Sequence, residues 1–168
     1  MKKRTYDPYS ELVNKFNRDG IKYVIVGMSG INYYASRPQE TFATQDFDIF
    51  VKPTISNIKK AVTILEKMDY NLVVKKGALK NFSLKEIIRQ KNTIIASDPY
   101  GIVFELILAV SGYTFSQMQK DAIIFNVGNI PIKVAGLKKL LRSKRLAGRK
   151  KDKLFLNRFE ILLKEKGG

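Results

Sequence analysis

The chain has no cysteine and no histidine among its 168 residues. Without cysteine it can form no disulfide and no thiolate metal ligand, and without histidine it lacks the commonest general base and the usual zinc ligand. No apolar run approaches the roughly 18–20 residues of a membrane span, and the basic start is followed by polar residues instead of the apolar segment of a signal peptide. We therefore expect a soluble, cytoplasmic protein in which oxygen atoms bind any metal and a carboxylate or a lysine serves as any base.

Acidic residues are scarce beside basic ones. Lys and Arg total 31 against 15 Asp and Glu, which gives a formal net charge of +16 and a pI near 10.0. This excess favours polyanionic partners such as nucleic acid or nucleotides, and anionic membrane headgroups would fit the charge as well. With 45% hydrophobic residues, the length predicts a single domain over 1–168, which begins with a helix within 1–20 and ends with a basic helical pair over 136–168.

The segment Asp46-Phe47-Asp48-Ile49-Phe50-Val51 alternates acidic and apolar residues and predicts a strand over 44–51. Because successive strand side chains point to opposite faces, Asp46 and Asp48 share one face, with Cα atoms about 6–7 Å apart. Two ionised carboxylates so placed repel each other, and a hard cation such as Mg²⁺ relieves the repulsion and brings phosphate oxygens with it. Taken alone, the pair is more typical of two solvated acids at the entrance of a strand.

A second candidate acid lies in the predicted strand 102–110, which is apolar throughout except for Glu105. An ionised glutamate in such surroundings is costly unless it is paired or bound to a metal. The alternative is a glutamate on an edge strand or on the solvent face of the sheet.

Apolar periodicity, capping residues and turn signals predict the other elements. The expected strands are 22–26 and 72–74, with hairpins 93–97/102–110 and 123–127/130–134. A small-residue turn is expected at 27–30, a short helix at 31–35 and an irregular loop at 36–43. A helix capped by Asp7 is expected at 8–18, and another is expected from Thr54 or Ser56 to 68. A short helix opened by a capping box is expected at 83–89. The other expected helices are a short one at 115–120 and two at the end of the chain, 137–146 and 153–164.

This order of elements resembles the nucleotidyltransferase superfamily that shares the DNA polymerase β-like fold. In particular it resembles the small prokaryotic branch of minimal nucleotidyltransferases and AbiEii-type toxins. The matching residues run from Val26-Gly27-Met28-Ser29 through Arg37 and Thr44-Gln45-Asp46-Phe47-Asp48-Ile49, and resume at Glu105, Val134-Ala135-Gly136-Leu137, Lys144, Arg149, Lys150 and Asp152. The resemblance implies an α/β (α+β) nucleotidyltransferase fold, in which helices flank a mixed central β-sheet and a helical pair forms the C-terminal part.

The resemblance also implies a division of roles among named residues. Gly27 and Ser29 are expected to hold the phosphates of a nucleotide, and the expected metal ligands, which also carry catalysis, are Asp46, Asp48 and Glu105. Two Mg²⁺ ions, or Mn²⁺ in their place, would bind there. Lys144 and Arg149 would contact phosphates, and Asp152 would orient these basic groups or cap the last helix. The remaining cations of this region are interpreted as a solvated face: Lys138, Lys139, Arg142, Arg145 and Lys151.

The expected activity is transfer of a nucleoside monophosphate from an NTP to a hydroxyl acceptor, with RNA such as a tRNA end, a protein or a small molecule as the candidate acceptors. A toxin role, with an antitoxin as partner, is compatible with this activity. The alternative is a non-catalytic module of the same fold that binds nucleic acid or a partner protein. Met28 favours the alternative, because the family usually has a second Gly or Ser at this position.

Overall fold

The computed structural model describes residues 7–35 and 46–165, with side chains described as far as Arg158. Its helices are α1 (Pro8–Arg18), α2 (Gly27–Asn32), α3 (Ile55–Lys67), α4 (Leu84–Arg89), α5 (Phe115–Lys120), α6 (Leu137–Ala147) and α7 (Lys150–Glu165), with a 3₁₀ turn η2 (Leu79–Asn81). Its strands are β1 (Tyr23–Ile25), β2 (Asp46–Val51), β3 (Asn71–Val74), β4 (Gly77–Ala78), β5 (Ile94–Ser97), β6 (Val103–Ile107), β7 (Ile123–Val127) and β8 (Ile130–Val134). No helix in the described part of the chain combines the length and apolar character needed to cross a bilayer.

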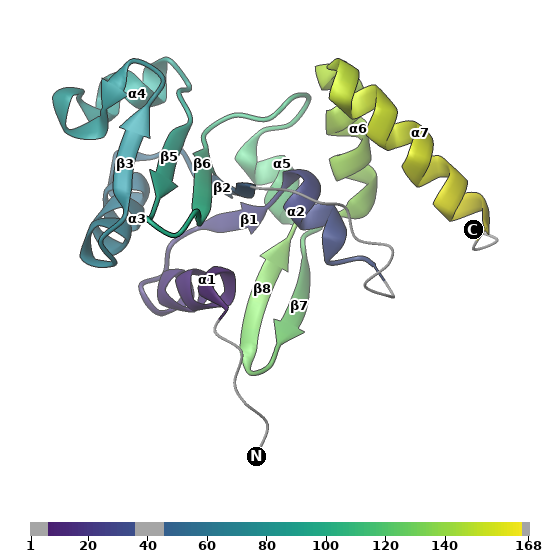
Figure 1. Cartoon of the computed structure of the whole chain (residues 1–168), viewed down its shortest axis with the longest axis horizontal. Helices are drawn as coiled ribbons and strands as arrows, with labels where there is room; N and C mark the ends of the chain where they lie inside the picture. Colours follow the sequence, from purple (N-terminus) through teal and green to yellow (C-terminus); the bar gives the residue numbers. More distant parts are fainter. Residues whose placement is uncertain (1–6, 36–45, 166–168) are drawn as a thin grey trace.

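The described strands form one sheet in the order β4-β3-β5-β6-β2-β1-β8-β7. Two of its pairings are parallel, β2 with β6 and β1 with β8, and the others are antiparallel. The expectation of a mixed central sheet flanked by helices, with a helical pair at the C-terminal end, is therefore confirmed (Figure 1). Both predicted hairpins, β5–β6 and β7–β8, are present and antiparallel.

The alternation along β2 divides its side chains between the two faces of the sheet. Phe47 stacks on Tyr9 of α1, with ring centroids 4.9 Å apart, and meets Phe104 of β6 edge-on at 5.9 Å. Phe50 points to the opposite face and meets Phe115 of α5 edge-on at 5.4 Å. Each such buried aromatic contributes about 2 kcal/mol through the area it removes from water. The core on both faces thus fixes β2, and with it the orientation of the two aspartates.

The structure corrects the prediction around the small-residue turn. Helix α2 begins at Gly27 itself and ends at Asn32, whereas we expected a turn at 27–30 and a helix at 31–35. Val26, in an extended conformation, takes the N-cap position without a side-chain hydrogen bond. No Ser, Thr, Asp or Asn therefore marks this helix start, which explains why the sequence pattern indicates a turn. The loop predicted at 36–43, with Arg37 in it, and residues Thr44 and Gln45 lie outside the described residues.

Other boundaries differ from the prediction for identifiable reasons. Strand β6 ends at Ile107, short of the expected 110, and β4 and η2 have no counterpart in the prediction. Helix α7 begins at Lys150, three residues before the expected start, because Gly148 ends α6 in the left-handed conformation and the chain re-enters a helix almost at once. For α3 the N-cap is Thr54, whose hydroxyl accepts a hydrogen bond from the Asn57 amide, and Ser56 lies within the helix.

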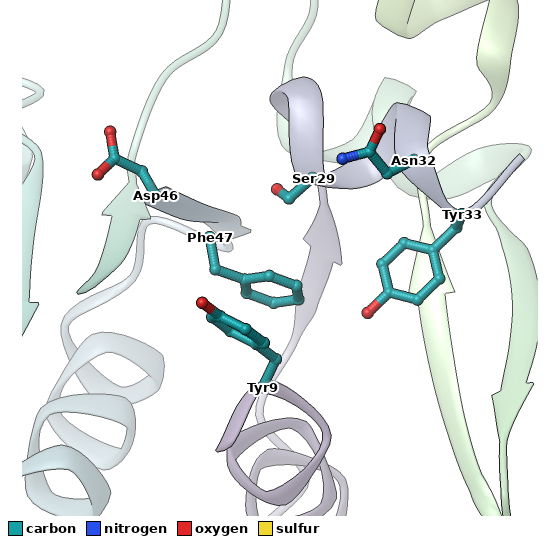
Figure 2. A pocket seen from close by; sticks show the side chains of 6 residues that line it. All are labelled: Tyr9, Ser29, Asn32, Tyr33, Asp46 and Phe47. Carbon is teal, nitrogen blue, oxygen red and sulfur yellow. The ribbon is translucent and has the colours of Figure 1, made fainter. Parts of the chain in front are cut away.

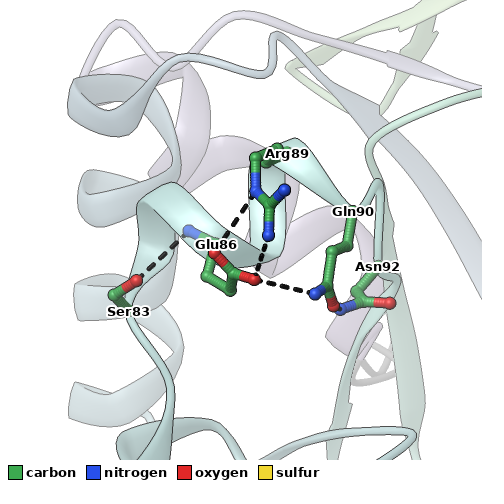
Figure 3. A network of polar contacts seen from close by, with 5 residues as sticks. All are labelled: Ser83, Glu86, Arg89, Gln90 and Asn92. Carbon is green, nitrogen blue, oxygen red and sulfur yellow. Dashed lines mark hydrogen bonds and ion pairs between the residues drawn. The ribbon is translucent and has the colours of Figure 1, made fainter.

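The capping box predicted for α4 is half formed (Figure 3). The Ser83 hydroxyl accepts a hydrogen bond from the Glu86 amide at 3.2 Å, as predicted. The Glu86 carboxylate, however, turns along the helix and accepts hydrogen bonds from Arg89 and, at 2.8 Å, from the Gln90 side chain. The hydrogen bond from Arg89 lowers the pKa of Glu86. A complete capping box forms instead on α5, between Thr114 and Gln117.

A buried amide joins α3 to the two strands on which the site is built. Asn57 is 8% exposed, and its side-chain oxygen accepts a hydrogen bond from the Lys22 amide at 2.8 Å. Its side-chain nitrogen donates to the backbone oxygens of Lys22 and Lys52 at 2.9 and 3.0 Å. Lys22 precedes β1 and Lys52 follows β2, so one side chain contacts three backbone groups next to these strands. The oxygens of Lys22 and Lys52 also accept hydrogen bonds from the amides of Lys52 and Thr54, so it is the Lys22 amide that depends on Asn57.

We therefore predict that Asn57→Ala destabilises the protein by roughly 2–3 kcal/mol, because it removes three hydrogen bonds and leaves the Lys22 amide without this acceptor. Urea unfolding followed by circular dichroism measures the effect. Thr63→Ala is the matched control, since the Thr63 hydroxyl on the same helix makes a single hydrogen bond within α3. Equal stability of the two variants would show that Asn57 does not join the elements as described.

Candidate active site

The parallel pairing of β2 with β6 brings the two candidate acidic segments together. In this register Asp48 is the direct partner of Glu105. Neighbouring strands lie about 4.8 Å apart and directly paired residues project to the same face, so the two carboxylates are neighbours. Asp46, two residues earlier on β2, lies on that face as well. The face that Asp46 and Asp48 share, as the alternation predicted, thus also carries Glu105, which lies 57 positions after Asp48 in the chain.

Glu105 does not lie at an edge of the sheet. Its strand has β5 on one side and β2 on the other, and Glu105 pairs with Ile95 as well as with Asp48. Its side chain is partly buried. The alternative of a glutamate on an edge strand is therefore excluded, and the residue faces the same hollow as the aspartates.

Gly27 lies directly against the carboxylate of Asp48. A Cβ atom built on Gly27 would lie 2.2 Å from Asp48 Oδ2, and Gly27 has φ +65°, in the left-handed region. Two independent constraints, contact distance and backbone conformation, thus require glycine at the start of α2. From the sequence we expected Gly27 to hold a nucleotide phosphate. The structure adds that the absence of a side chain on Gly27 leaves room for the Asp48 carboxylate.

Ser29 connects α2 to the acidic strand through its buried hydroxyl. The hydroxyl donates a hydrogen bond to the Val26 oxygen at 2.9 Å and accepts one from the Asp48 amide at 3.0 Å. A serine hydroxyl has a single hydrogen to donate, and phosphate oxygens only accept. Contact between this hydroxyl and a phosphate would therefore require breaking its bond to Val26. As it stands, Ser29 fixes the position of Asp48.

The opposite wall of the site carries an ion cluster around one buried carboxylate, with residues from α6, α7 and the bend between them. Asp152 is 1% exposed and accepts hydrogen bonds from Arg149 Nε at 2.7 Å, from Arg149 Nη2 at 3.3 Å and from Lys144 Nζ at 3.3 Å. Burial opposes ionisation of this carboxyl, but the hydrogen bond from Arg149 and the charges of Lys144 and Arg149 outweigh it and lower the pKa of Asp152. Asp152 thus orients both cations, one of the two roles expected for it, from the first turn of α7.

A cleft of about 810 Å³ lies between the sheet and these helices. Every predicted site residue except Ser29 lines it: Gly27, Asp46, Asp48, Glu105, Lys144 and Arg149. Sequence reasoning missed Thr93, Ser111 and Ser143 in the lining. Ser143 could have been found from its position three residues after Leu140 on the helix face that also carries Lys144.

Two of the cations interpreted as a solvated face have more specific surroundings. Lys151 lines the cleft, although it is exposed. Lys139 is partly buried and forms an ion pair with Asp121 at 2.9 Å. The other three, Lys138, Arg142 and Arg145, are exposed as expected.

The electrostatics of the cleft are dominated by the acids on its floor. Burial, followed by the charges of Glu105 and Asp46, raises the pKa of Asp48 to about 8, and Lys144 acts in the opposite direction. In addition, Asp48 Oδ1 is a buried oxygen with no hydrogen-bond partner. A buried carboxylate oxygen without a donor is costly in any folded protein.

These features fit a hard divalent cation in donor chemistry and placement, since carboxylate oxygens are the ligands that Mg²⁺ prefers. The unpartnered Asp48 Oδ1 is the observation that supports the fit. As the side chains are oriented, however, no three carboxylates within residues 7–35 and 46–158 lie close enough together to form a ready-made metal site. Asp48 and Glu105 already lie side by side on the floor of the cleft, so a third ligand would have to turn toward them to share an ion.

A second, smaller cavity of about 240 Å³ also reaches Asp46 (Figure 2). The other lining residues are Tyr9, Ser29, Asn32, Tyr33 and Phe47. In Figure 2 the Asp46 carboxylate points away from the stacked rings of Tyr9 and Phe47. This follows from strand alternation and places Asp46 at the boundary between the two cavities.

No protein-family model matches the chain, and no curated protein matches it significantly. Among solved structures, the chain is similar to the crystal structure of an antigenic nucleotidyltransferase-like protein from Paracoccidioides brasiliensis, with 18% sequence identity and a TM-score of 0.49. The match covers 80% of this chain and 62% of that chain. The chain thus spans less than two thirds of the length of that protein.

The pKa of Asp48 leads to a prediction about stability. Its pKa of about 8 in the folded protein lies above the ordinary aspartate value of 3.8, so between these pH values the folded state binds more protons than the unfolded state. Stability of the metal-free protein should therefore fall as pH rises through this window. Asp48→Asn removes the charge, so this variant should melt roughly 3–8 °C higher than the wild type near pH 8 and depend less on pH.

Melting temperatures in EDTA, measured from about pH 5 to about pH 9, test this expectation. Asp69→Asn serves as a control, because Asp69 is exposed and its φ of 64° is one that asparagine tolerates. Curves of the same shape for wild type and Asp48→Asn would contradict the burial of an ionisable Asp48 beside Glu105.

Proposed function

We propose that the protein is a metal-dependent nucleotidyltransferase that moves a nucleoside monophosphate from an NTP to a hydroxyl acceptor. One observation carries the proposal: Asp48 and Glu105 are paired on neighbouring strands, with an unpartnered buried oxygen, on the floor of a cleft whose other wall carries Lys144 and Arg149. Acids on one side and cations on the other are what a metal-bound polyphosphate requires.

The reaction is a displacement at phosphorus. The acceptor oxygen forms a bond to the α-phosphorus, and the bond from that phosphorus to the pyrophosphate oxygen breaks. The hydroxyl proton passes to a carboxylate, either Glu105 or one of the two aspartates, because the chain has no histidine to act as base. Since no covalent intermediate with the protein is needed, the main tasks of the site are positioning and electrostatic stabilisation.

The residues of this chain divide these tasks. Asp46, Asp48 and Glu105 would hold Mg²⁺ or Mn²⁺, which supplies positive charge to offset the charge developing on the phosphate oxygens. Lys144, held by Asp152 at 3.3 Å, keeps further N–H groups available for phosphate, and Arg149 is held by the same carboxylate. Gly27 leaves room for Asp48, and Ser29 fixes the strand on which Asp48 lies. We assign Gly27 and Ser29 to the nucleotide site in this supporting sense.

The alternative, a non-catalytic module of this fold, makes a different prediction about the acids. A surface that only docks nucleic acid does not need three carboxylates on the floor of its cleft. Met28, which favours the alternative, is partly buried and lines the cleft beside Gly27. Binding of a non-hydrolysable NTP that requires Mg²⁺ and is lost in Asp48→Asn would favour the enzyme.

The activity is tested by incubating the protein with Mg²⁺, each α-labelled NTP in turn, and cellular RNA and protein. We expect label transfer that needs the metal and falls at least about 100-fold in Asp48→Asn and Glu105→Gln, because each loses a carboxylate that would hold the metal. Glu66→Gln is the matched control, since Glu66 is exposed on α3, outside the cleft lining. Transfer that persists in Asp48→Asn would refute the assignment of this residue.

The expected toxin role is a proposal about the consequence of transfer in the cell. If transfer modifies an essential RNA or protein, expression of the wild-type chain should arrest growth, and Asp46→Ala should abolish the arrest. Colony counts after induction measure this, with immunoblots to confirm equal protein levels. Harmless expression of an active wild-type enzyme would count against a toxin role and leave the chemistry untouched.

A further inference from the structure

Exposed cations gather where α6 meets α7. We call this surface the basic elbow and define it by Arg145, Arg149, Lys150, Lys151 and Lys153, all of which are exposed. The single acid in segment 145–153 is Asp152, which is 1% exposed and whose carboxylate is taken by Lys144 and Arg149. Within the segment, no acid is therefore left to pair with Lys150, Lys151 or Lys153.

The shape of the elbow is fixed by the chain itself. Gly148 ends α6 with φ +64°, and α7 begins two residues later. Lys144 of α6 and Arg149 both pair with Asp152 of α7, so one buried carboxylate links the two helices across the bend. In Figure 1 this bend stands at the end of the molecule opposite α3 and α4. The cations thus project from a rigid corner and not from a loose tail.

The elbow is continuous with the cleft. Arg149 and Lys151 belong to the elbow and also line the cavity that contains Asp46, Asp48 and Glu105. Positive charge therefore extends from the outer surface into the cavity and ends beside the acids. A ligand with regularly spaced negative charges and a neutral end would match this sequence of charges, since its charged part would lie on the elbow and its end would reach the floor.

We propose that the basic elbow binds the phosphate backbone of a single-stranded nucleic acid and directs its terminal hydroxyl into the cleft. This inference rests on the proposed function, because it names the acceptor: the terminal hydroxyl oxygen bonds to the α-phosphorus, pyrophosphate leaves and the proton passes to a carboxylate. A flexible strand can follow a corner and enter a cavity, whereas a bilayer is flat. Leu146 and Leu154 are the strongly exposed large apolar residues described on α6 and α7, and two such side chains are too little for stable membrane insertion.

The test measures binding of a fluorescent oligouridine about twelve nucleotides long, a length within the range of known single-strand sites. The elbow variant carries Arg145→Gln, Lys150→Gln and Lys153→Gln, which spares the cations of the cleft lining. The control carries Lys59→Gln, Lys60→Gln and Lys67→Gln, three exposed lysines of α3. Both variants lose the same charge, and circular dichroism verifies that both are folded. Neither NTP nor Mg²⁺ is present, so the result does not depend on catalysis.

We expect the elbow variant to bind roughly tenfold or more weakly at about 0.1 M salt, with the slope of log affinity against log salt reduced by about 2. The control should bind like the wild type. Equal loss in both variants would show unspecific attraction, and no loss in the elbow variant would place binding elsewhere, so either result overturns the proposal. Binding to vesicles rich in phosphatidylserine without binding to the oligonucleotide would also overturn it.

A second measurement locates the end of the strand. An oligouridine with 4-thiouridine at its 3′ end should cross-link on irradiation to residues that line the cleft, and cross-links confined to other surfaces would refute the path. The two proposals fail in distinguishable ways. Cross-linking in the cleft without label transfer would reject the enzyme, and transfer to some other acceptor with unchanged oligonucleotide binding by the elbow variant would reject the elbow.

Discussion

The close contact of Asp48 with Glu105 and Gly27 is the constraint on which the site depends. The parallel β2–β6 register places one acid beside the other, and the glycine leaves the space that the Asp48 carboxylate fills. Left to themselves, two neighbouring partly buried acids oppose folding at neutral pH. The aromatic core on the other face of the sheet, with Phe47 packed between Tyr9 and Phe104, holds β2 in place against this repulsion.

The parts of the fold that sequence reasoning predicted well are those determined by local chemistry. The alternation of Asp46 to Val51, the cap at Asp7 and the turns of both hairpins each depend on residues a few positions apart. Asp98, for example, closes its turn by accepting hydrogen bonds from the amides of Tyr100 and Ile102. Such interactions leave a pattern in the sequence whatever the rest of the chain does.

The parts that it missed depend on contacts between distant segments. The start of α2 has no capping side chain and is fixed through Ser29, whose hydroxyl accepts a hydrogen bond from the Asp48 amide of β2. The early start of α7 follows directly on the left-handed Gly148, and Asp152 in its first turn binds Lys144 from the preceding helix. The sequence pattern likewise left open whether Glu105 lies at an edge, because its neighbours β5 and β2 are decided by the topology of the sheet.

Two aspartates of the cleft show how surroundings decide what an identical side chain can do. Asp152 is buried more completely, yet two cations satisfy it and its pKa is lowered; Asp48 faces other acids, keeps one oxygen unpartnered, and its pKa is raised. Lys144 acts on both carboxyl groups but hydrogen-bonds only to Asp152. The side chains of the cleft thus supply enough positive charge to pair with Asp152 but not with Asp48. Asp48 has no such cation, so the charge that balances it must come from outside the chain. This difference makes Asp48, and not Asp152, the centre of the proposed metal site.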